Sequence, residues 1–360
     1  METVVNPDRC FWRGRRVLVT GHTGFKGAWL SLWLESLGAE VSGLALAALP
    51  TEPSLFALAC ELGGRDRRAD LREHADVRAV VEASRPEVVF HLGAQSLVRA
   101  SYTDPVGTYA TNVMGLVHLL DAVRHVSGVR VVVNVTSDKC YENREWLWAY
   151  REDEPMGGHD PYSSSKGCAE LITTAWRRSY FAVEAVAMAS ARAGNVIGGG
   201  DWALDRIVPD CIRAFSAGRT VEVRNPRAVR PWQHVLEPLC GYLLLAERLW
   251  HDGAAVAEGW NFGPAEADAL PVAEIVGTLA ALWGEGAGLT VTSALQPHEA
   301  GSLKIDASKA RARLGWQPRL KVATTLAWTA EWYRHQRDGT AARALCLEQI
   351  ERYQTLETTR

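Results

Sequence analysis

The chain lacks an apolar run that approaches the length of about 20 residues needed to cross a bilayer. Its first residues, METVVNPDRCFWRGRR, also lack the apolar core of a signal peptide. The seven cysteines are odd in number, scattered and free of CxxC spacing, which indicates reduced thiols and argues against a zinc site. We therefore expect a cytoplasmic protein with no membrane association and no bound metal.

An excess of charge of either sign is missing as well. The 39 Lys and Arg residues nearly balance the 42 Asp and Glu residues, so the net charge of -3 provides no basic field for nucleic acid. Neither an internal repeat nor a low-complexity segment is visible. With 360 residues and 47% hydrophobic side chains, the chain can bury the core of one large or two smaller domains.

A glycine-rich loop follows the first predicted strand, Arg16 to Thr20 (RVLVT). The loop GHTGFKG leads into a helical pattern, AWLSLWLESLG. Glycines between a strand and a helix let backbone amides approach a pyrophosphate. A glycine triplet alone is also typical of an ordinary tight turn, but the strand before it and the helix after it favour a dinucleotide-binding loop. His22, inside this loop, is expected to be a packing residue. The predicted cofactor-binding residues here are Gly21, His22, Gly24, Phe25, Lys26 and Gly27.

The second strand, Glu40 to Leu46, does not end in the acid that usually holds the adenosine ribose. The sequence therefore leaves the choice between NAD and NADP open. Three nearby arginines are more typical of a solvated loop than of a 2′-phosphate site: Arg65, Arg67 and Arg68. A short third strand in RADLRE is expected to end at Asp70 and Leu71, which would meet the adenine.

The fourth strand, Pro86 to Leu92, runs into HLGAQS, whose small residues suit close contact with a cofactor. We assign Leu92, Gly93 and Ala94 to the cofactor, and Gln95 and Ser96 to the substrate. Asn112 lies within the next predicted helix, Pro105 to His125. A mid-helix asparagine is usually solvent-facing or bound to a carbonyl, so its assignment to the cofactor depends on its surroundings.

The strongest chemical signal lies between Val131 and Lys166. The buried-strand pattern VVVNVTSDK ends in polar side chains, and the carboxyl ends of such strands face the ligand crevice of an α/β sheet. Tyr162 and Lys166 of YSSSK lie four apart on one helix face. A phenol beside an ammonium is expected to lose its proton near neutrality, which makes Tyr162 a candidate base. The predicted catalytic residues are Ser137, Asp138, Lys139, Tyr162 and Lys166.

The strand and helix alternation loosens beyond Arg192. We expect an α/β protein with a Rossmann-type doubly wound parallel sheet over residues 1–193, which carries the cofactor and the catalytic residues. A smaller α/β substrate domain over 194–340, allowing for chain crossings, and a helical tail over 341–360 would follow.

Spaced arginines in RNPRAVRPWQHV suit a diphosphate, because a guanidinium binds oxygens bidentately, although surface arginines are also common. Most of the fourteen tryptophans are expected in the core, with Trp202 and Trp232 kept as ligand candidates. The predicted substrate-binding residues in this half are Arg192, Asn195, Trp202, Arg224 and Arg230.

Together these motifs resemble the extended short-chain dehydrogenase/reductase family, and within it the sugar-nucleotide 4,6-dehydratases, above all their CDP-glucose subgroup. The closer likeness lies in GHTGFKGAWLSLWL, SYTDPVGTYATNVMG, TSDKCYEN, DPYSSSKGCAEL, RAGNVIGGGDWALDR, NPRAVRPWQHVLEPL and LKIDASKARARLGW. The resemblance covers the chain from about Arg16 to Pro318. Lys139 stands where the dTDP-glucose enzymes of the family have a glutamate.

This resemblance implies a lyase with bound NAD that is reduced and re-oxidised in one turnover. Tyr162, helped by Lys166, would deprotonate the sugar 4-hydroxyl, while Ser137 would bind the 4-oxygen. Asp138 would protonate the departing 6-hydroxyl, and Lys139 would act as a base or as an electrostatic stabiliser. The family also implies a homodimer through the helices Pro105 to His125 and Tyr162 to Tyr180.

Two alternatives remain. A 4-epimerase or reductase of the same fold needs the Tyr and Lys but no elimination acid. A non-catalytic NAD-sensing or scaffold protein has no use for the intact Ser, Tyr and Lys. Another nucleotide could also replace CDP, because base recognition depends on loop geometry around residues 192–235.

Overall fold

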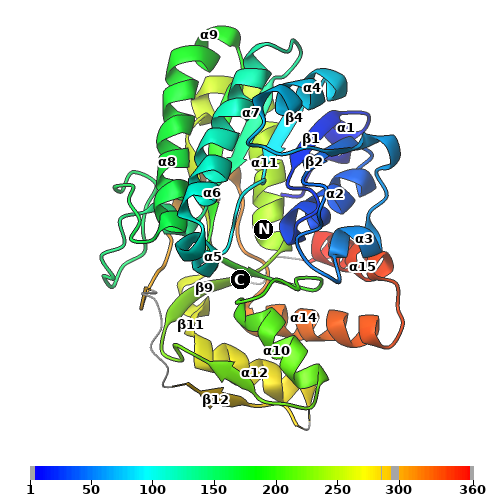
Figure 1. Ribbon diagram of the computed structural model, residues 1–360, viewed down its shortest axis with the longest axis vertical. Helices are drawn as coiled ribbons and strands as arrows, with labels where there is room; N and C mark the ends of the chain where they lie inside the picture. The colour runs from blue at the N-terminus through cyan, green and yellow to red at the C-terminus, as the bar shows by residue number, and fades with distance from the viewer. Residues whose placement is uncertain (1–4, 285, 293–299, 357–360) are drawn as a thin grey trace.

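A seven-stranded parallel sheet forms the centre of the protein (Figure 1). The structure, a computed structural model, describes residues 5–284, 286–292 and 300–356. The strand order is β10-β6-β5-β4-β1-β2-β3, which is the doubly wound, Rossmann-type arrangement that the sequence predicted. The strands are β1 (Arg16–Thr20), β2 (Glu40–Ala45), β3 (Asp66–Arg68), β4 (Val88–His91), β5 (Val131–Val135), β6 (Ala187–Ala193) and β10 (Gly259–Phe262).

Helices cover both faces of this sheet because successive strand residues point to opposite sides. Val17 and Val19 of β1 pack into the apolar cluster that contains α2 (Phe25–Ser36) and α11 (Leu236–Asp252). Leu18, between them, packs into the other cluster, which is built with the opposite layer of helices. That layer contains α4 (His74–Ser84), α7 (Gly115–Arg124) and α8 (Pro161–Trp176).

The two long helical stretches of the second layer begin in the same way, with an aspartate N-cap followed by a proline. Asp104 and Asp160 each accept a backbone hydrogen bond within the first turn that follows, and a proline occupies that turn. The helix predicted over Pro105 to His125 is divided into α6 (Pro105–Tyr109), a π-helical turn η2 (Ala110–Met114) and α7. Likewise α8 continues through a π-helical turn η4 (Arg177–Phe181) into α9 (Ala182–Glu184).

A smaller unit lies below the sheet in the view of Figure 1. It contains a three-stranded sheet, β11-β9-β7, and a two-stranded pair, β12-β8. Its strands are β7 (Asn195–Ile197), β8 (Val221–Val223), β9 (Val229–His234), β11 (Ala269–Pro271) and β12 (Leu289–Val291). Its main helices are α10 (Ile207–Ser216), α12 (Val272–Trp283) and α14 (Val322–Arg337). Shorter helices elsewhere are α1 (Arg9–Trp12), α3 (Leu55–Ala59), α5 (Val98–Thr103), α13 (Ser308–Leu314), η1 (Gly63–Arg65), η3 (Asp138–Cys140), η5 (Gly253–Val256) and η6 (Glu266–Asp268).

The chain crosses between the two units more than once. Beyond the predicted boundary at residue 193, α11 and β10 return to the large sheet, where β10 pairs with β6. The predicted tail forms α15 (Ala342–Thr355), which packs on α2 and α3 and buries Leu345, Ile350 and Tyr353. The tail therefore belongs to the core of the first unit.

One strand differs from its predicted position. The third strand is Asp66–Arg68, and Asp70 and Leu71 follow it in a turn. Arg68 therefore belongs to an edge strand and not to a loop. Among the residues that the structure describes, no helix has both the length and the apolarity to cross a membrane.

The contact between α11 and β10 predicts the effect of one substitution on stability. A Cβ added at Gly241 would lie 2.3 Å from the Phe262 ring, so Gly241→Ala should lower the free energy of unfolding by about 1 to 3 kcal/mol through overpacking. Gly277→Ala on α12 is the matched control, because no atom lies within 4 Å of its added Cβ. It should raise stability by about 0.5 to 1 kcal/mol. Urea unfolding followed by circular dichroism would compare them; equal midpoints for the two variants would contradict this packing.

Candidate active site

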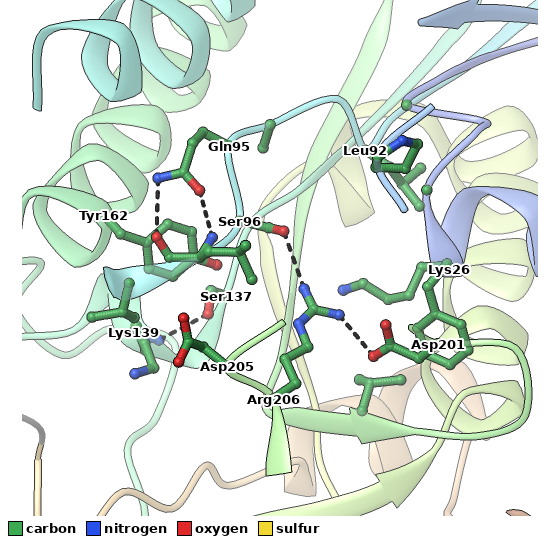
Figure 2. A pocket seen from close by; sticks show the side chains of 18 of the residues that line it. Lys26, Leu92, Gln95, Ser96, Ser137, Lys139, Tyr162, Asp201, Asp205 and Arg206 are labelled. Atoms are coloured by element: carbon green, nitrogen blue, oxygen red, sulfur yellow. Dashed lines mark hydrogen bonds and ion pairs between the residues drawn. The ribbon is translucent and has the colours of Figure 1, made fainter. Parts of the chain in front are cut away.

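A cavity of about 770 Å³ opens at the carboxyl ends of the central strands, between the two units. Residues after β1, β4 and β5 line one side of it, and residues of the smaller unit line the other. The strand order reverses between β1 and β4, and ligands of open α/β sheets bind at such a reversal. Figure 2 shows side chains from both units pointing into this space.

The glycine loop after β1 forms one end of the cavity and requires its glycines. Gly21 has φ +70°, and a Cβ there would lie 2.8 Å from the backbone of Gly93. A Cβ on Gly27 would lie 2.1 Å from the carbonyl oxygen of Gly21. Phe25 and Lys26 line the cavity at the first turn of α2, where free backbone N–H groups favour an anion. This cradle fits the pyrophosphate of a dinucleotide.

The end of β2 carries no carboxylate on the cavity wall, which there consists of Ala45 and Leu46. Arg68 donates to the carbonyl oxygen of Leu46 at 3.0 Å and forms an ion pair with Asp66 at 2.8 Å. Asp70 and Leu71 line the adjoining wall. Apolar surface at this end suits an adenine ring.

His22 has a packing role in this loop. Its side chain is fully buried and does not line the cavity, although the sequence analysis counted it among the cofactor-binding residues. Its Nε2 lies 2.8 Å from Asp66 Oδ1, and its ring meets Phe56 edge to face at 4.9 Å. Burial lowers the pKa of His22, so the neutral imidazole is favoured. The ring therefore ties the glycine loop to β3.

Asn112 does not line the cavity either, but binds a loop that does. It is buried in η2, with Oδ1 accepting from the amide of Gln95 at 2.8 Å. Its Nδ2 donates to the carbonyl of Gln95 and to Ser165 Oγ, both at 2.9 Å. The predicted cofactor contact is thus corrected, because Asn112 fixes the loop that carries the cavity-lining residues Leu92, Gly93, Ala94, Gln95 and Ser96.

All five predicted catalytic residues line the cavity together. Ser137, Asp138 and Lys139 follow β5, whereas Tyr162 and Lys166 belong to the first turns of α8. Figure 2 shows Ser137, Lys139 and Tyr162 on the same side of the cavity. Ser137 Oγ donates to Asp138 Oδ1 at 3.0 Å and accepts from the amide of Lys139 at 3.2 Å. Lys166 Nζ donates to the carbonyl oxygen of Val135 at 3.4 Å.

Burial shifts the pKa values of the predicted catalytic residues. It raises the pKa of Tyr162 to about 12, against the effect of a hydrogen bond with Ser137. Burial therefore acts against the predicted loss of the phenolic proton near neutrality. The reason is that desolvation disfavours the phenolate and also lowers the pKa of Lys166, to about 8.

Asp138 is the buried acid of the group. Burial raises the pKa of this carboxyl, although Lys139 and Ser137 act in the opposite direction. Its Oδ2 is buried and has no hydrogen-bond partner among the described residues. A buried carboxyl with a raised pKa and an oxygen without a hydrogen-bond partner beside a cavity is suited to serve as a general acid.

Arg206 is a cavity residue that the sequence analysis missed. Its Nη1 pairs with Asp201 Oδ2 at 3.0 Å, and its Nη2 donates to Ser96 Oγ at 3.1 Å, so it bridges the two units (Figure 2). The signal available in the sequence was its place directly before α10, beyond the Gly-Gly-Gly turn. Lys26, with a pKa lowered to about 7 by burial and by Lys166 and Arg206, lines the same space.

The other predicted substrate residues divide into two groups. Asn195, Arg224 and Arg230 line the cavity, as does Trp232. Arg224 Nη1 pairs with Asp205 Oδ1 at 2.7 Å. Arg230 is buried, and its Nη1 donates to the carbonyl oxygen of Val229 at 2.9 Å.

Arg192 and Trp202 do not line the cavity, so their predicted contacts with substrate are corrected. Arg192 is buried, with Nη2 paired to Glu170 Oε2 at 2.8 Å. Trp202 packs edge to face on Trp332 and Tyr333, with ring centroids 5.7 and 5.9 Å away. Both side chains point away from the cavity because their partners, Glu170 for Arg192 and the α14 aromatic rings for Trp202, lie inside the protein.

A doubly wound sheet with a glycine loop at β1 and a Ser, Tyr and Lys group at β5 and α8 defines an extended short-chain dehydrogenase/reductase. The chain belongs to the family described as GDP-mannose 4,6 dehydratase, whose model matches residues 18–329.

Three comparisons illustrate this membership. The chain is 53% identical over 334 residues to CDP-glucose 4,6-dehydratase of Salmonella typhimurium strain LT2, covering 91% of this chain and 92% of that protein. It is 26% identical to UDP-glucose 4-epimerase of Mycolicibacterium smegmatis, covering 89% and 99%. The structure of MoeE5 in complex with UDP-glucuronic acid and NAD is 27% identical, with a TM-score of 0.76, and covers 89% of this chain and 99% of that one.

The glycine loop yields a prediction about cofactor affinity. Gly27→Ala places a Cβ within 2.1 Å of a backbone oxygen, so the loop must shift away from the position that admits a pyrophosphate. We expect at least about tenfold weaker NAD binding, because a displaced amide loses its charge-assisted hydrogen bond. Isothermal calorimetry would measure this. Gly64→Ala, at a site with no atom within 4 Å, is the control; parental affinity in Gly27→Ala would show that the loop does not form the cofactor cradle.

Proposed function

We propose that this protein catalyses the NAD-dependent 4,6-dehydration of CDP-D-glucose to CDP-4-keto-6-deoxy-D-glucose, a lyase reaction of deoxysugar biosynthesis. The observation that carries the proposal is the buried Asp138, whose pKa burial raises, in the same cavity as Tyr162. The 53% identity to a CDP-glucose 4,6-dehydratase supports the same substrate.

The cofactor proposed is NAD, consistent with its presence in the MoeE5 structure. Gly21, Gly24 and Gly27, with the first turn of α2, would hold the pyrophosphate, and Asp70 and Leu71 would adjoin the adenine. When bound, NAD would supply an acceptor for the hydride of the sugar C4 and, once reduced, the donor of a hydride to C6, so that no net oxidation or reduction of the cofactor would result.

Tyr162 accepts the proton of the sugar 4-hydroxyl as C4 becomes a ketone. Since burial holds the pKa of its phenol at about 12, Tyr162 acts as the base only after its own proton has passed to solvent. The hydrogen bond with Ser137 and the positive charge of Arg206 favour the resulting phenolate, and an ammonium at Lys166, one helix turn away, would add to this charge. Ser137 also binds the 4-oxygen. The ketone then acidifies the hydrogen at C5.

Asp138 and Lys139 serve the elimination. Asp138 gives its proton to the departing 6-hydroxyl, which leaves as water when the C5 proton is lost. Lys139, beside it, either removes the C5 proton as a neutral amine or stabilises the enolate as an ammonium. The diphosphate of the substrate lies toward Arg206, Arg224 and Arg230.

A substrate panel tests the proposal and separates it from an epimerase. CDP-, UDP-, dTDP- and GDP-glucose are each incubated with enzyme and NAD, and products are analysed by mass spectrometry. We expect CDP-glucose to give a 4-keto product lighter by one water. A product of unchanged mass would instead identify an epimerase, and no product from any of the four would refute the proposed activity.

Tyr162→Phe should lower kcat by about 10²-fold or more, because the base for C4 oxidation is lost while the ring remains. The melting temperature should stay close to that of the parent. Steady-state assays with CDP-glucose would measure the loss. Turnover at the parental rate in the folded variant would remove Tyr162 from the mechanism.

Lys139→Ala should separate the two halves of the reaction. Oxidation at C4 does not require Lys139, so NADH absorbance should appear after substrate is added and should then persist, because the elimination fails. Stopped-flow absorbance and exchange of the C5 hydrogen in heavy water would follow these steps. Exchange at the parental rate would show that Lys139 is neither the base nor the enolate stabiliser.

We further propose a homodimer through two helical stretches, the first formed by α6, η2 and α7 and the second by α8 and η4. Large apolar side chains are exposed along these helices, with Val106 77% and Leu171 63% accessible. A second copy of the chain would cover them. The double variant Val106→Glu/Leu171→Glu should be monomeric in light scattering, whereas Leu147→Glu, at an 84% exposed position in another loop, should not change the mass. A parent protein that is itself monomeric would refute this interface.

We also propose that the protein works in the cytoplasm. All seven cysteines are free, and five of them are buried, which suits a reducing compartment. Cell fractionation with an antibody against the chain would test the location.

A further inference from the structure

The carboxyl end of β5 is held by two consecutive turns of α8. Lys166 donates to the carbonyl oxygen of Val135, and Thr136, the next residue, donates from Oγ1 to Glu170 Oε1 at 2.5 Å. Glu170 lies four residues after Lys166, on the same helix face. Ser137 and Asp138 follow directly, so the position of the catalytic residues depends on this anchor.

Glu170 is a buried carboxylate with a complete set of partners. Its Oε2 accepts from Ser190 Oγ at 2.6 Å and pairs with Arg192 Nη2 at 2.8 Å. Burial opposes ionisation of Glu170, but the charge and hydrogen bonds of Arg192, with those of Ser190 and Thr136, outweigh burial and lower its pKa. The carboxylate is therefore charged throughout the neutral range.

The titratable groups that interact electrostatically with Lys166 come from four elements. Tyr162, on the same face of α8, has a pKa of about 12 and is uncharged near pH 8. Burial raises the pKa of Cys140 on η3 well above its usual value and lowers that of His91 on β4 to about 3, so both are neutral near pH 8. Lys26 on α2 has a pKa of about 7 and is mostly neutral there. Glu170 on α8 is the charged group that opposes the desolvation of Lys166.

We propose that Glu170 is a positioning residue for the dehydration, whose carboxylate fixes the end of β5 through Thr136 and keeps Lys166 in its ammonium form. This inference rests on the proposed function for its catalytic meaning. A charged Lys166 supplies the positive charge that a phenolate at Tyr162 requires, so loss of the Glu170 charge should affect turnover at alkaline pH first.

The direction in which the Lys166 pKa should move follows from the negative charge of Glu170. Removing a nearby negative charge disfavours the ammonium, so the Lys166 pKa should fall below its value of about 8 in Glu170→Gln. The protein is labelled with ¹³C-lysine and titrated by NMR, with the Lys166 signal assigned through Lys166→Arg. We expect a titration midpoint lower by about half a pH unit or more, and an alkaline limb of the kcat profile on CDP-glucose that moves the same way.

Two matched variants separate charge from packing. Glu170→Asp retains the charge and should keep the Lys166 midpoint near that of the parent. Ser190→Ala removes a neutral partner of the same carboxylate, outside the cavity lining, and should also leave the midpoint unchanged. A midpoint in Glu170→Asp as low as in Glu170→Gln would overturn the proposal.

Glu170→Gln leaves Arg192 buried without its ion-pair partner, which can prevent folding. The double variant Glu170→Gln/Arg192→Gln removes both charges, and its reference is Arg192→Gln, from which it differs only in the Glu170 charge; the Lys166 midpoint should be lower in the double variant than in Arg192→Gln. A midpoint that does not fall in whichever of these comparisons has folded variants would refute the proposal. Since the titration needs no turnover, inactivity toward CDP-glucose would refute the proposed function without deciding this point.

Discussion

Exclusion of water from the carboxyl edge of the central sheet is the constraint on which the rest of the site depends. Thr136, Ser137 and Asp138 continue a strand that is buried along its whole length, so their polar groups must find partners inside the protein. The buried pair of Glu170 and Arg192 meets this requirement. Removing two charges from water is costly, and further hydrogen bonds compensate for it: Ser190 and Thr136 donate to Glu170, and Arg192 donates to the Tyr141 hydroxyl.

The same desolvation prepares the site for proton transfer. It moves Tyr162 and Asp138 toward their protonated, uncharged forms, and Lys166 and Lys26 toward neutral amines. Groups whose pKa values are shifted in opposite directions within one cavity can exchange protons with a bound substrate at small free-energy differences. A surface arrangement of the same side chains would keep each group near its usual pKa and would lack this property.

The smaller unit contributes cations whose positions are fixed before substrate arrives. Arg206 is held by Asp201 and Ser96, and Arg224 is held by Asp205. Arg230 is held by backbone carbonyl oxygens. Because Ser96 belongs to the first unit, the bridge through Arg206 also joins the two walls of the cavity. Fixed guanidinium groups lose little side-chain entropy on binding a diphosphate.

The sequence by itself determined the sheet, the glycine loop and the grouping of the five predicted catalytic residues. Strand composition, glycine spacing and the four-residue interval between Tyr162 and Lys166 are local patterns, and each of them is preserved in the fold. Long apolar strands also fix which residues lie at the carboxyl edge, so Ser137, Asp138 and Lys139 could be placed correctly beside Tyr162.

Only the tertiary structure decided which other polar residues reach the cavity and how the site ionises. Arg192 turns inward because Glu170, 22 residues earlier, offers a carboxylate, whereas Arg206 turns toward Ser96, 110 residues away. Asn112 and His22 lie beside cavity residues in sequence, yet both are bound by buried partners. The pKa of Tyr162 rises, where local charge alone predicted a fall, because desolvation depends on everything that surrounds a group, and sequence neighbours account for little of that environment.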